Sequence, residues 1–110
     1  MANIYKNAFY DPANTDVISI YTTPSDSRAI IQNIQVVNET GSKTVQFSIY
    51  DASANVTYLA AHGSISGPTT CNFAKGPIVL EENDIISAQT TSTSNISAVL
   101  AILETNRNEQ

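Results

Sequence analysis

The chain has 110 residues, of which 42% are hydrophobic and only 14% are charged, and its formal net charge is −5. A chain of this length forms one domain that buries roughly two-thirds of its unfolded surface, so it can fold without disulfides or a metal. The five basic residues never cluster, which excludes a nucleic-acid groove and argues against an anionic membrane surface. The many neutral polar residues favour a surface that packs against other proteins.

The first 16 residues contain an apolar and aromatic segment, residues 4–10, followed by the turn sequence Asp11-Pro12-Ala13-Asn14. Two interpretations stay open for this segment. It is the first strand at the edge of a sheet, or it is an arm that docks on a neighbouring subunit, because Tyr and Phe anchor interfaces. We assign residues 1–16 to this N-terminal arm or edge strand.

The centre of the chain shows the clearest alternation. In residues 43–50, Val45, Phe47 and Ile49 face one way while the polar residues between them face the other, as in a half-buried strand. Ile30, Ile34 and Val36 give residues 28–37 a similar apolar face, and Gly41 in the polar break between the two segments can supply a positive φ. The pattern predicts that these two strands form a hairpin.

The remaining segments predict a sandwich. After the arm, the segments that predict strands are residues 17–21, 28–37, 43–50, 56–62, 71–74, 78–80, 85–91 and 96–103. The last two are expected to form a second hairpin around the polar tip at residues 91–95. No segment has a helical period, so we predict an all-β, single-domain antiparallel β-sandwich, jelly-roll-like, with about eight short strands. It covers residues 17–104, and residues 105–110 form a polar C-terminal tail.

The last strand gives the first indication of an interface. Residues 98–103 are apolar at every position, so both faces of this strand are expected to be covered. One face would pack on the core and the other on a neighbouring subunit or on the arm. The residues predicted to contact a partner are Ile4, Tyr5, Phe9, Tyr10, Val99, Ala101 and Leu103.

Candidates for chemistry are few. His62 is the only histidine, it has no ligand partner at metal spacing, and no serine lies in a nucleophile elbow, so we predict that the chain is not an enzyme and uses no cofactor. Cys71 is the only cysteine and is predicted to be buried as a small apolar residue.

Glu81, Glu82 and Asp84 form an acidic corner. This corner is expected to be a solvated turn, with one weakly held cation as the alternative. The start of the chain shows no signal-peptide pattern, and its longest apolar run is too short to span a bilayer.

Several segments, taken in their order, resemble a known family. They are Tyr5-Lys6-Asn7-Ala8, Ile20-Tyr21-Thr22-Thr23-Pro24, Arg28-Ala29-Ile30-Ile31-Gln32-Asn33-Ile34-Gln35-Val36-Val37-Asn38, Tyr58-Leu59-Ala60, Ile78-Val79-Leu80-Glu81-Glu82-Asn83-Asp84-Ile85-Ile86, and the final strand ending at Leu103-Glu104. Together they span residues 5–104, and the chain resembles a family of small virion proteins of tailed bacteriophages, common in marine and cyanobacterial phages. Members often have Gly where this chain has Asn83, and Asn also tolerates the left-handed conformation.

The resemblance implies a jelly-roll or sandwich subunit of the virion that decorates or cements the capsid, often as a homotrimer. The partner would be the major capsid protein or another virion protein, with no nucleic acid and no membrane. The protein would be made in the host cytoplasm, without a signal peptide, and would end on the capsid surface. A component of the tail, head-tail junction or head fibre stays open. So does a glycan-binding sandwich module, although the chain has no Trp to stack on a sugar.

Overall fold

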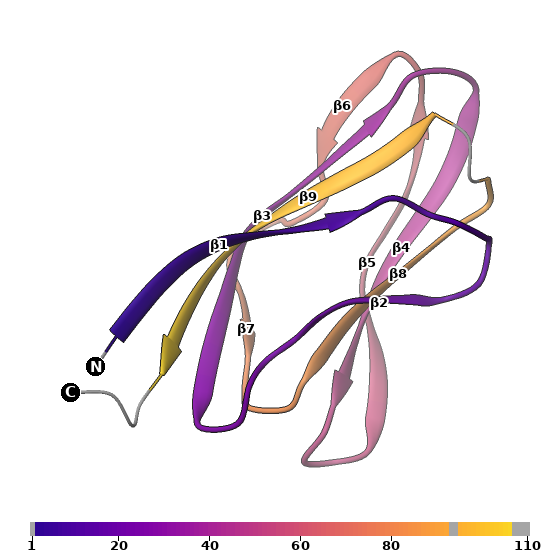
Figure 1. Ribbon diagram of the computed structural model, residues 1–110. Coiled ribbons are helices and arrows are strands. Elements are labelled where there is room, and N and C mark those ends of the chain that lie inside the picture. The colour runs from indigo at the N-terminus through magenta and orange to yellow at the C-terminus, as the bar shows by residue number, and fades with distance from the viewer. Residues whose placement is uncertain (1, 93–94, 107–110) are drawn as a thin grey trace.

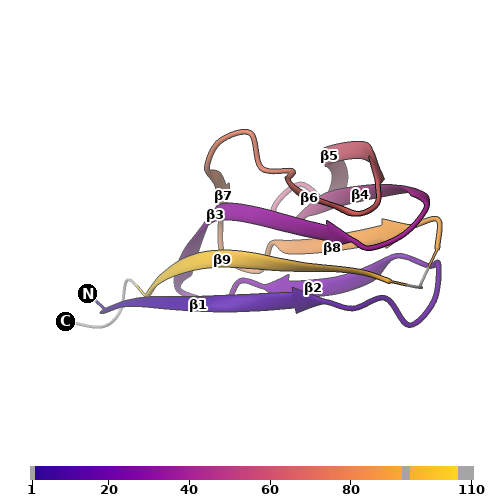
Figure 2. The same ribbon diagram turned by 90° about the horizontal axis from the view of Figure 1, so that it is seen from above.

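The computed structural model describes residues 2–92 and 95–106, and all of their regular structure is β (Figure 1). The described strands are β1 (Ala2–Tyr10), β2 (Ile18–Thr22), β3 (Ser27–Asn38), β4 (Ser42–Asp51), β5 (Val56–Ser66), β6 (Thr69–Asn72), β7 (Ile78–Leu80), β8 (Ile85–Thr90) and β9 (Ile96–Asn106). They form two antiparallel sheets packed face to face, which confirms the predicted all-β sandwich (Figure 2). Within the described residues there is no helix that could cross a membrane.

The chain runs through the two sheets as one long hairpin that is folded over on itself. The first sheet has the order β1-β9-β3-β6, with β7 also paired to β3, and the second has the order β2-β8-β4-β5. Early strands therefore pair with late ones: β1 with β9, β2 with β8, β3 with β6 and β7, and β4 with β5. This nesting is the wrapped double Greek key of a jelly roll. In it, β6 and β7 together fill the place of one strand beside β3.

Both predicted hairpins are wrong. Strands β3 and β4 belong to different sheets, and so do β8 and β9, so the links between them cross from one sheet to the other. Alternation shows which side chains of a strand face inward, but it does not show which strand lies beside it. The link between β3 and β4 does use Gly41 at a φ of 73°, as expected. The true hairpin joins β4 to β5, where Asn55 adopts a φ of 55°.

The core lies between the sheets and is centred on Phe47, which is fully buried. Its ring meets Tyr10 and Phe73 edge to face, with centroids 6.4 and 5.9 Å away. Every second residue of β4, β8 and β9 faces this core, as the alternation predicts, whereas in β3 the alternation is interrupted by a register shift between Ile31 and Asn33. Aromatic edge-to-face pairs add to the stabilisation from burial, so Phe47 ties the edge strand β1 to the rest of the domain.

A buried lysine closes one end of the sandwich. Lys43 Nζ donates to Asn38 Oδ1 at 2.7 Å and to the carbonyl oxygen of Thr40. The Asn38 amide, itself fully buried, donates to the carbonyl oxygens of Gly41 and Ile65 at 2.9 and 2.8 Å. A buried charge is tolerable only when it is hydrogen-bonded, and here Lys43 holds the crossing between the two sheets in place.

Candidate interaction surface

Four apolar side chains form a line across the outer face of the first sheet. Tyr5 on β1 is paired with Leu103 on β9, Leu103 with Ile30 on β3, and Ile30 with Val79 on β7. Paired residues on adjacent antiparallel strands share one face, so these four lie side by side. The residues at the two ends of this line are widely exposed, Tyr5 at 75% and Val79 at 59%, and the two between them, Leu103 and Ile30, are half-buried. We call these four residues the apolar stripe.

A second exposed aromatic ring lies on the same face, four residues further along β1. Phe9 is 71% exposed and is paired with Val99. Between this pair and the apolar stripe, small Ala101 lies opposite Asn7 on one side and Asn33 on the other. The Asn33 side-chain oxygen is buried and has no hydrogen-bond partner among the described residues. The face therefore has apolar groups on either side of a polar strip, which consists of Asn7 and Asn33 with Ala101 between them.

Five of the seven residues predicted to contact a partner lie on this face. They are Tyr5, Phe9, Val99, Ala101 and Leu103, and the pairing of β1 with β9 brings them together. The edge-strand interpretation of the first segment thus describes β1, which pairs with β9 along its whole length. The face that the last strand turns outward is half-buried from Val99 to Leu103 within this chain.

The other two predicted residues face the opposite way. Tyr10 is 2% exposed and packs in the core against Phe47, so its side chain has no surface to offer a partner, and we remove it from the candidate surface. Ile4 is paired with Glu104 on the inner side of the sheet. Since neighbouring residues of a strand point to opposite faces, Ile4 and Tyr5, or Phe9 and Tyr10, cannot both lie on one face.

The prediction that Ile30 shares the apolar face of Ile34 and Val36 is wrong, because the register of β3 shifts between Ile31 and Asn33 and puts Ile30 on the outer face. Val79 was not predicted as a surface residue. The available signal was an excess of apolar residues: Ile30 is next to buried Ile31, and Val79 stands between half-buried Ile78 and buried Leu80. In an alternating strand, one of two consecutive apolar residues must point outward. Only the register shows that these outward residues continue the line begun by Tyr5.

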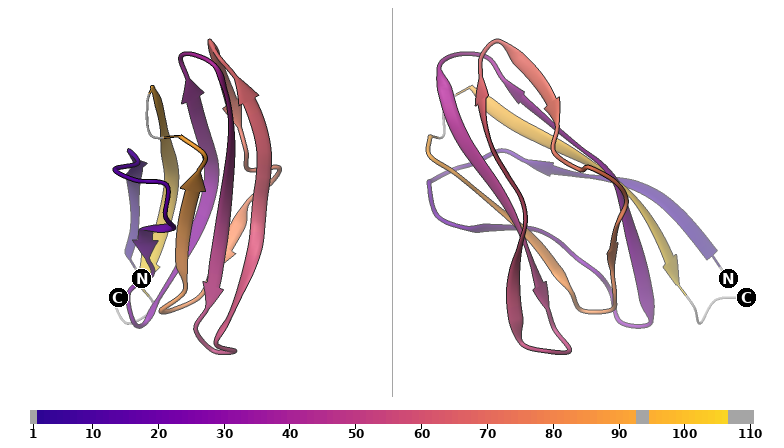
Figure 3. Two further views of the ribbon diagram at one scale, coloured as in Figure 1. Left: turned by 90° about the vertical axis from the view of Figure 1, so that its right-hand side faces the viewer. Right: turned by 180° about the vertical axis from the view of Figure 1, so that it is seen from behind.

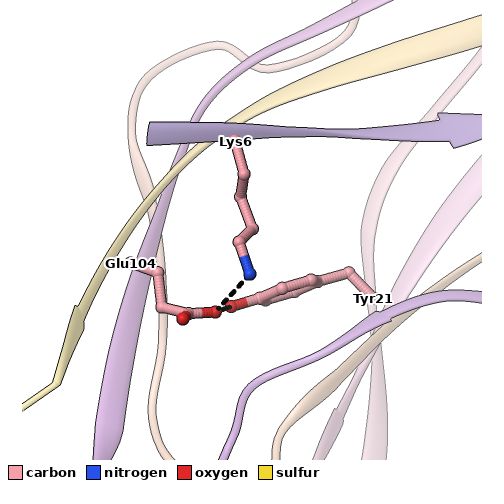
Figure 4. Close-up of polar contacts among 3 residues, drawn as sticks. All are labelled: Lys6, Tyr21 and Glu104. Carbon is pink, nitrogen blue, oxygen red and sulfur yellow. Dashed lines mark hydrogen bonds and ion pairs between the residues drawn. The ribbon is translucent and has the colours of Figure 1, made fainter. Parts of the chain in front are cut away.

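A polar cluster lies on the inner side of β1 and β9, at the end that projects beyond the second sheet (Figure 1). Glu104 Oε1 accepts hydrogen bonds from the Tyr21 hydroxyl at 2.5 Å and from Lys6 Nζ at 3.1 Å (Figure 4). Lys6 Nζ also lies 5.8 Å from the centroid of the Tyr21 ring. Tyr21 belongs to β2, so the cluster fastens the two sheets together.

Burial and these contacts shift the pKa values of the Tyr21 hydroxyl and the Glu104 carboxyl. Burial raises the pKa of Tyr21, and the neighbouring Glu104 carboxylate raises it further. Burial alone would raise the pKa of Glu104, but the hydrogen bonds from Tyr21 and Lys6 hold it below its ordinary value. Glu104 is therefore ionised and Tyr21 neutral near pH 7.

His62 and Cys71 lie on opposite sides of a groove of about 610 Å³ between β5 and residues 71–78. Phe73 and Ile78 are among its apolar lining residues, and Lys75 also lines it. Cys71 is exposed, so the prediction that it is buried is wrong. It lies on the short edge strand β6, all four residues of which are exposed, and it lines the open groove.

The acidic corner is held by backbone amides. The Asp84 carboxylate accepts hydrogen bonds from the amides of Ala52 and Glu81, both at 3.0 Å, and so fastens the β4–β5 hairpin to the start of β8. Asn83 adopts a φ of 68°, as expected for this turn. The described residues hold no group of three or more His, Cys, Asp or Glu side chains arranged to bind a metal.

Comparison with known proteins reveals the fold alone. No family model matches the chain, and no curated protein matches it. Over 99% of its length, the chain is similar to a chain in the structure of infectious bursal disease virus Gx strain, with a TM-score of 0.57 and 13% identity. It spans 32% of that chain, about a third of its length.

A second structure is the virus-like particle of extra small virus of the giant freshwater prawn Macrobrachium rosenbergii. There the match covers 94% of this chain and 79% of the other, with 14% identity and a TM-score of 0.33, too low to carry an argument. The first likeness therefore establishes that this sandwich is a fold also found in a chain of a virus.

Proposed function

We propose that this chain is a structural protein of a virus particle, a capsid decoration or cement subunit of a tailed phage. It binds the major capsid shell through the outer face of the β1-β9-β3-β7 sheet and acts as a homotrimer. The observation that carries this proposal is the apolar stripe, a line of apolar side chains across four strands that the chain itself leaves uncovered. The fold shared with a viral chain and the resemblance of residues 5–104 to phage virion proteins support it.

The chemistry of the surface fits a protein partner. Exposed apolar patches with polar surroundings mark interaction sites in soluble proteins. The stripe holds Tyr5, an aromatic residue of the kind that anchors interfaces, and exposed Asn7 beside it can exchange hydrogen bonds with a partner backbone. The rim includes the exposed pair Arg28 and Glu81, whose charged atoms lie 4.0 Å apart. A polar rim around an apolar centre is the usual anatomy of an interface.

The benefit of such binding to a shell is additive. A ligand present at a hundred times its dissociation constant stabilises the state that it binds by about 2.7 kcal/mol. Each bound subunit would add a similar amount to the free energy that internal pressure must overcome. Because a shell offers many equivalent positions, a weak contact at each one is enough to strengthen the particle.

Two measurements test the proposal. The first is the copy number of this chain in gradient-purified particles, by quantitative mass spectrometry against the most abundant shell protein. A count equal to the shell protein, or a simple fraction of it, supports decoration. A few copies per particle would place the chain in the tail, the head-tail junction or a fibre. Its absence from particles would overturn the virion role and favour the glycan-binding alternative.

The second measurement tests the surface. Particles that lack the chain are mixed with purified protein, and binding is followed by co-sedimentation. Tyr5→Ser with Val79→Ser should weaken binding at least 10-fold, because both side chains are anchors of the apolar stripe. Val17→Ser is the matched control, since Val17 is equally exposed but lies off the stripe. Unchanged binding by the double variant would exclude this face as the contact.

A further inference from the structure

The edges of the two sheets differ in how well they are protected. Strands β2, β6 and β7 are short edges of 5, 4 and 3 residues, whereas β1 has 9 residues and β5 has 11. Natural sheets protect long edges with charges, proline or covering segments. Neither β1 nor β5 contains proline or a carboxylate, and Lys6 is the only permanently charged residue in either. Both edges can therefore accept another strand.

Exposed apolar side chains concentrate on the same two strands. Of the eight large hydrophobic residues exposed in the described part of the chain, six lie on β1 or β5. Those on β5 are Val56, Tyr58 and Leu59, each between 41% and 59% exposed. Tyr58 is paired with Ile49 and Leu59 with Ser48, so they point to opposite faces of the sheet. Folding of one chain leaves both faces of β5 uncovered.

The charges are distributed unevenly between the two sides of the molecule. Residues 52–80 contain none of the ten carboxylates, although the chain as a whole has a net charge of −5. Lys75 and His62 line the groove beside β5. On the other side, β1 is followed directly by exposed Asp11, and exposed Asp16 comes just before β2. Lys6 on β1 and Asp51, which lies opposite Val56 at the start of β5, are the exceptions to this division. Two β5 edges facing each other would bring together two grooves whose lining holds Lys75 and no carboxylate, whereas β1 facing β5 brings Asp11 and Asp16 to the side that holds Lys75.

We infer that a second copy of this chain occupies the groove: the free edge of β1 in one copy adds to the free edge of β5 in the next. The two edges lie on opposite sides of the molecule (Figure 2, Figure 3), so the contact is head to tail and closes into a ring when the rotation per copy allows it. The homotrimer proposed above would be such a ring. Strand addition uses main-chain groups in the plane of the sheet, so the apolar stripe stays free for another partner.

The test blocks each edge separately and then mixes the variants. Ile4→Lys places a charge on the exposed inner side of β1, and Leu59→Lys does the same on β5. By light scattering, the wild-type chain is expected at a multiple of its 11.8 kDa mass, and each variant as a monomer. Their equimolar mixture should form a dimer, because the intact β1 edge of Leu59→Lys fits the intact β5 edge of Ile4→Lys. Ser97→Lys, an exposed position on the central strand β9, is the matched control and should keep the wild-type mass.

Several outcomes would overturn the inference. A monomeric wild type, a mixture that stays monomeric, or an Ile4→Lys variant that still forms a dimer through two β5 edges would each exclude head-to-tail pairing. Circular dichroism checks that each variant is folded, and Asn3→Lys and Thr57→Lys, at exposed polar positions on the same strands, replace any variant that is not. The assay uses the purified chain without particles, so its failure would leave the proposed virion role standing.

Discussion

The Tyr21 hydroxyl donates a 2.5 Å hydrogen bond to Glu104, and this contact links β2 in one sheet to β9 in the other. Because the pKa of Glu104 is held below its ordinary 4.5, ionisation of this carboxyl stabilises the fold above that pH, and the stabilisation is lost as the pH falls below it. Glu104→Gln should therefore lower the free energy of unfolding at pH 7 by about 1–3 kcal/mol. The share from half-exposed Lys6 is small, since solvent screens it.

The measurement for Glu104 is urea unfolding of both proteins between pH 7 and pH 3. The difference in unfolding free energy should shrink as the pH falls, because the wild-type carboxyl becomes neutral like the amide. A difference that stays constant over this range would mean that the charge of Glu104 contributes nothing.

Gly67 is packed against the backbone of the β3–β4 link. A Cβ on Gly67 would lie 2.5 Å from the Thr40 nitrogen and 2.6 Å from the Glu39 carbonyl carbon, whereas a Cβ on Gly76 would meet nothing within 4 Å. Gly67→Ala should cost about 1–3 kcal/mol or more, since backbone must move to admit the methyl group. Gly76→Ala, the matched control, should stay within about 0.5 kcal/mol of wild type. Thermal unfolding of the pair distinguishes them, and equal melting temperatures would contradict the packing.

Replacement of Asn38 by Asp is expected to destabilise the fold. The Asn38 amide nitrogen donates to two carbonyl oxygens, those of Gly41 and Ile65, and a carboxylate would face both oxygens with no proton to donate. Asn38→Asp should therefore lower the free energy of unfolding by about 1–3 kcal/mol, even though it gives Lys43 an opposite charge. Chemical denaturation at pH 7 tests this. A variant as stable as wild type would show that ion pairing outweighs the two lost hydrogen bonds.

The sequence predicted side-chain direction well in β4, but wrongly for Ile30 in β3, and it predicted strand neighbours badly. Alternation in residues 43–50 correctly placed Val45 and Phe47 in the core, because side-chain direction is a local property of a strand. The predicted hairpins failed because pairing in a jelly roll joins strands that are distant in sequence. For the same reason the prediction found Tyr5 and Leu103 as apolar residues, but only the register placed Ile30 and Val79 beside them.

The first strand is expected to be essential for folding. Tyr10 lies in the core, and β1 covers the edge of β9 over nine paired positions. A chain that lacks residues 1–10 would expose β9 and lose the contact with Phe47, at a cost of several kcal/mol in a domain whose total stability is about 5–15 kcal/mol. Circular dichroism should show an unfolded or strongly destabilised protein. A truncated chain that keeps its wild-type melting temperature would show that the segment is a separate docking arm.

The nested pairing also fixes the order of events during synthesis. Among the nine described strands, β1 is made before the others and its partner β9 after them: Tyr10 pairs with Ala98 and Ala2 with Asn106. At the usual 5–20 residues per second, the roughly 90 residues in between take about 5–20 s to translate. During that time β1 has no neighbour in its own sheet, and its aromatic side chains are available to any chaperone or nascent chain nearby.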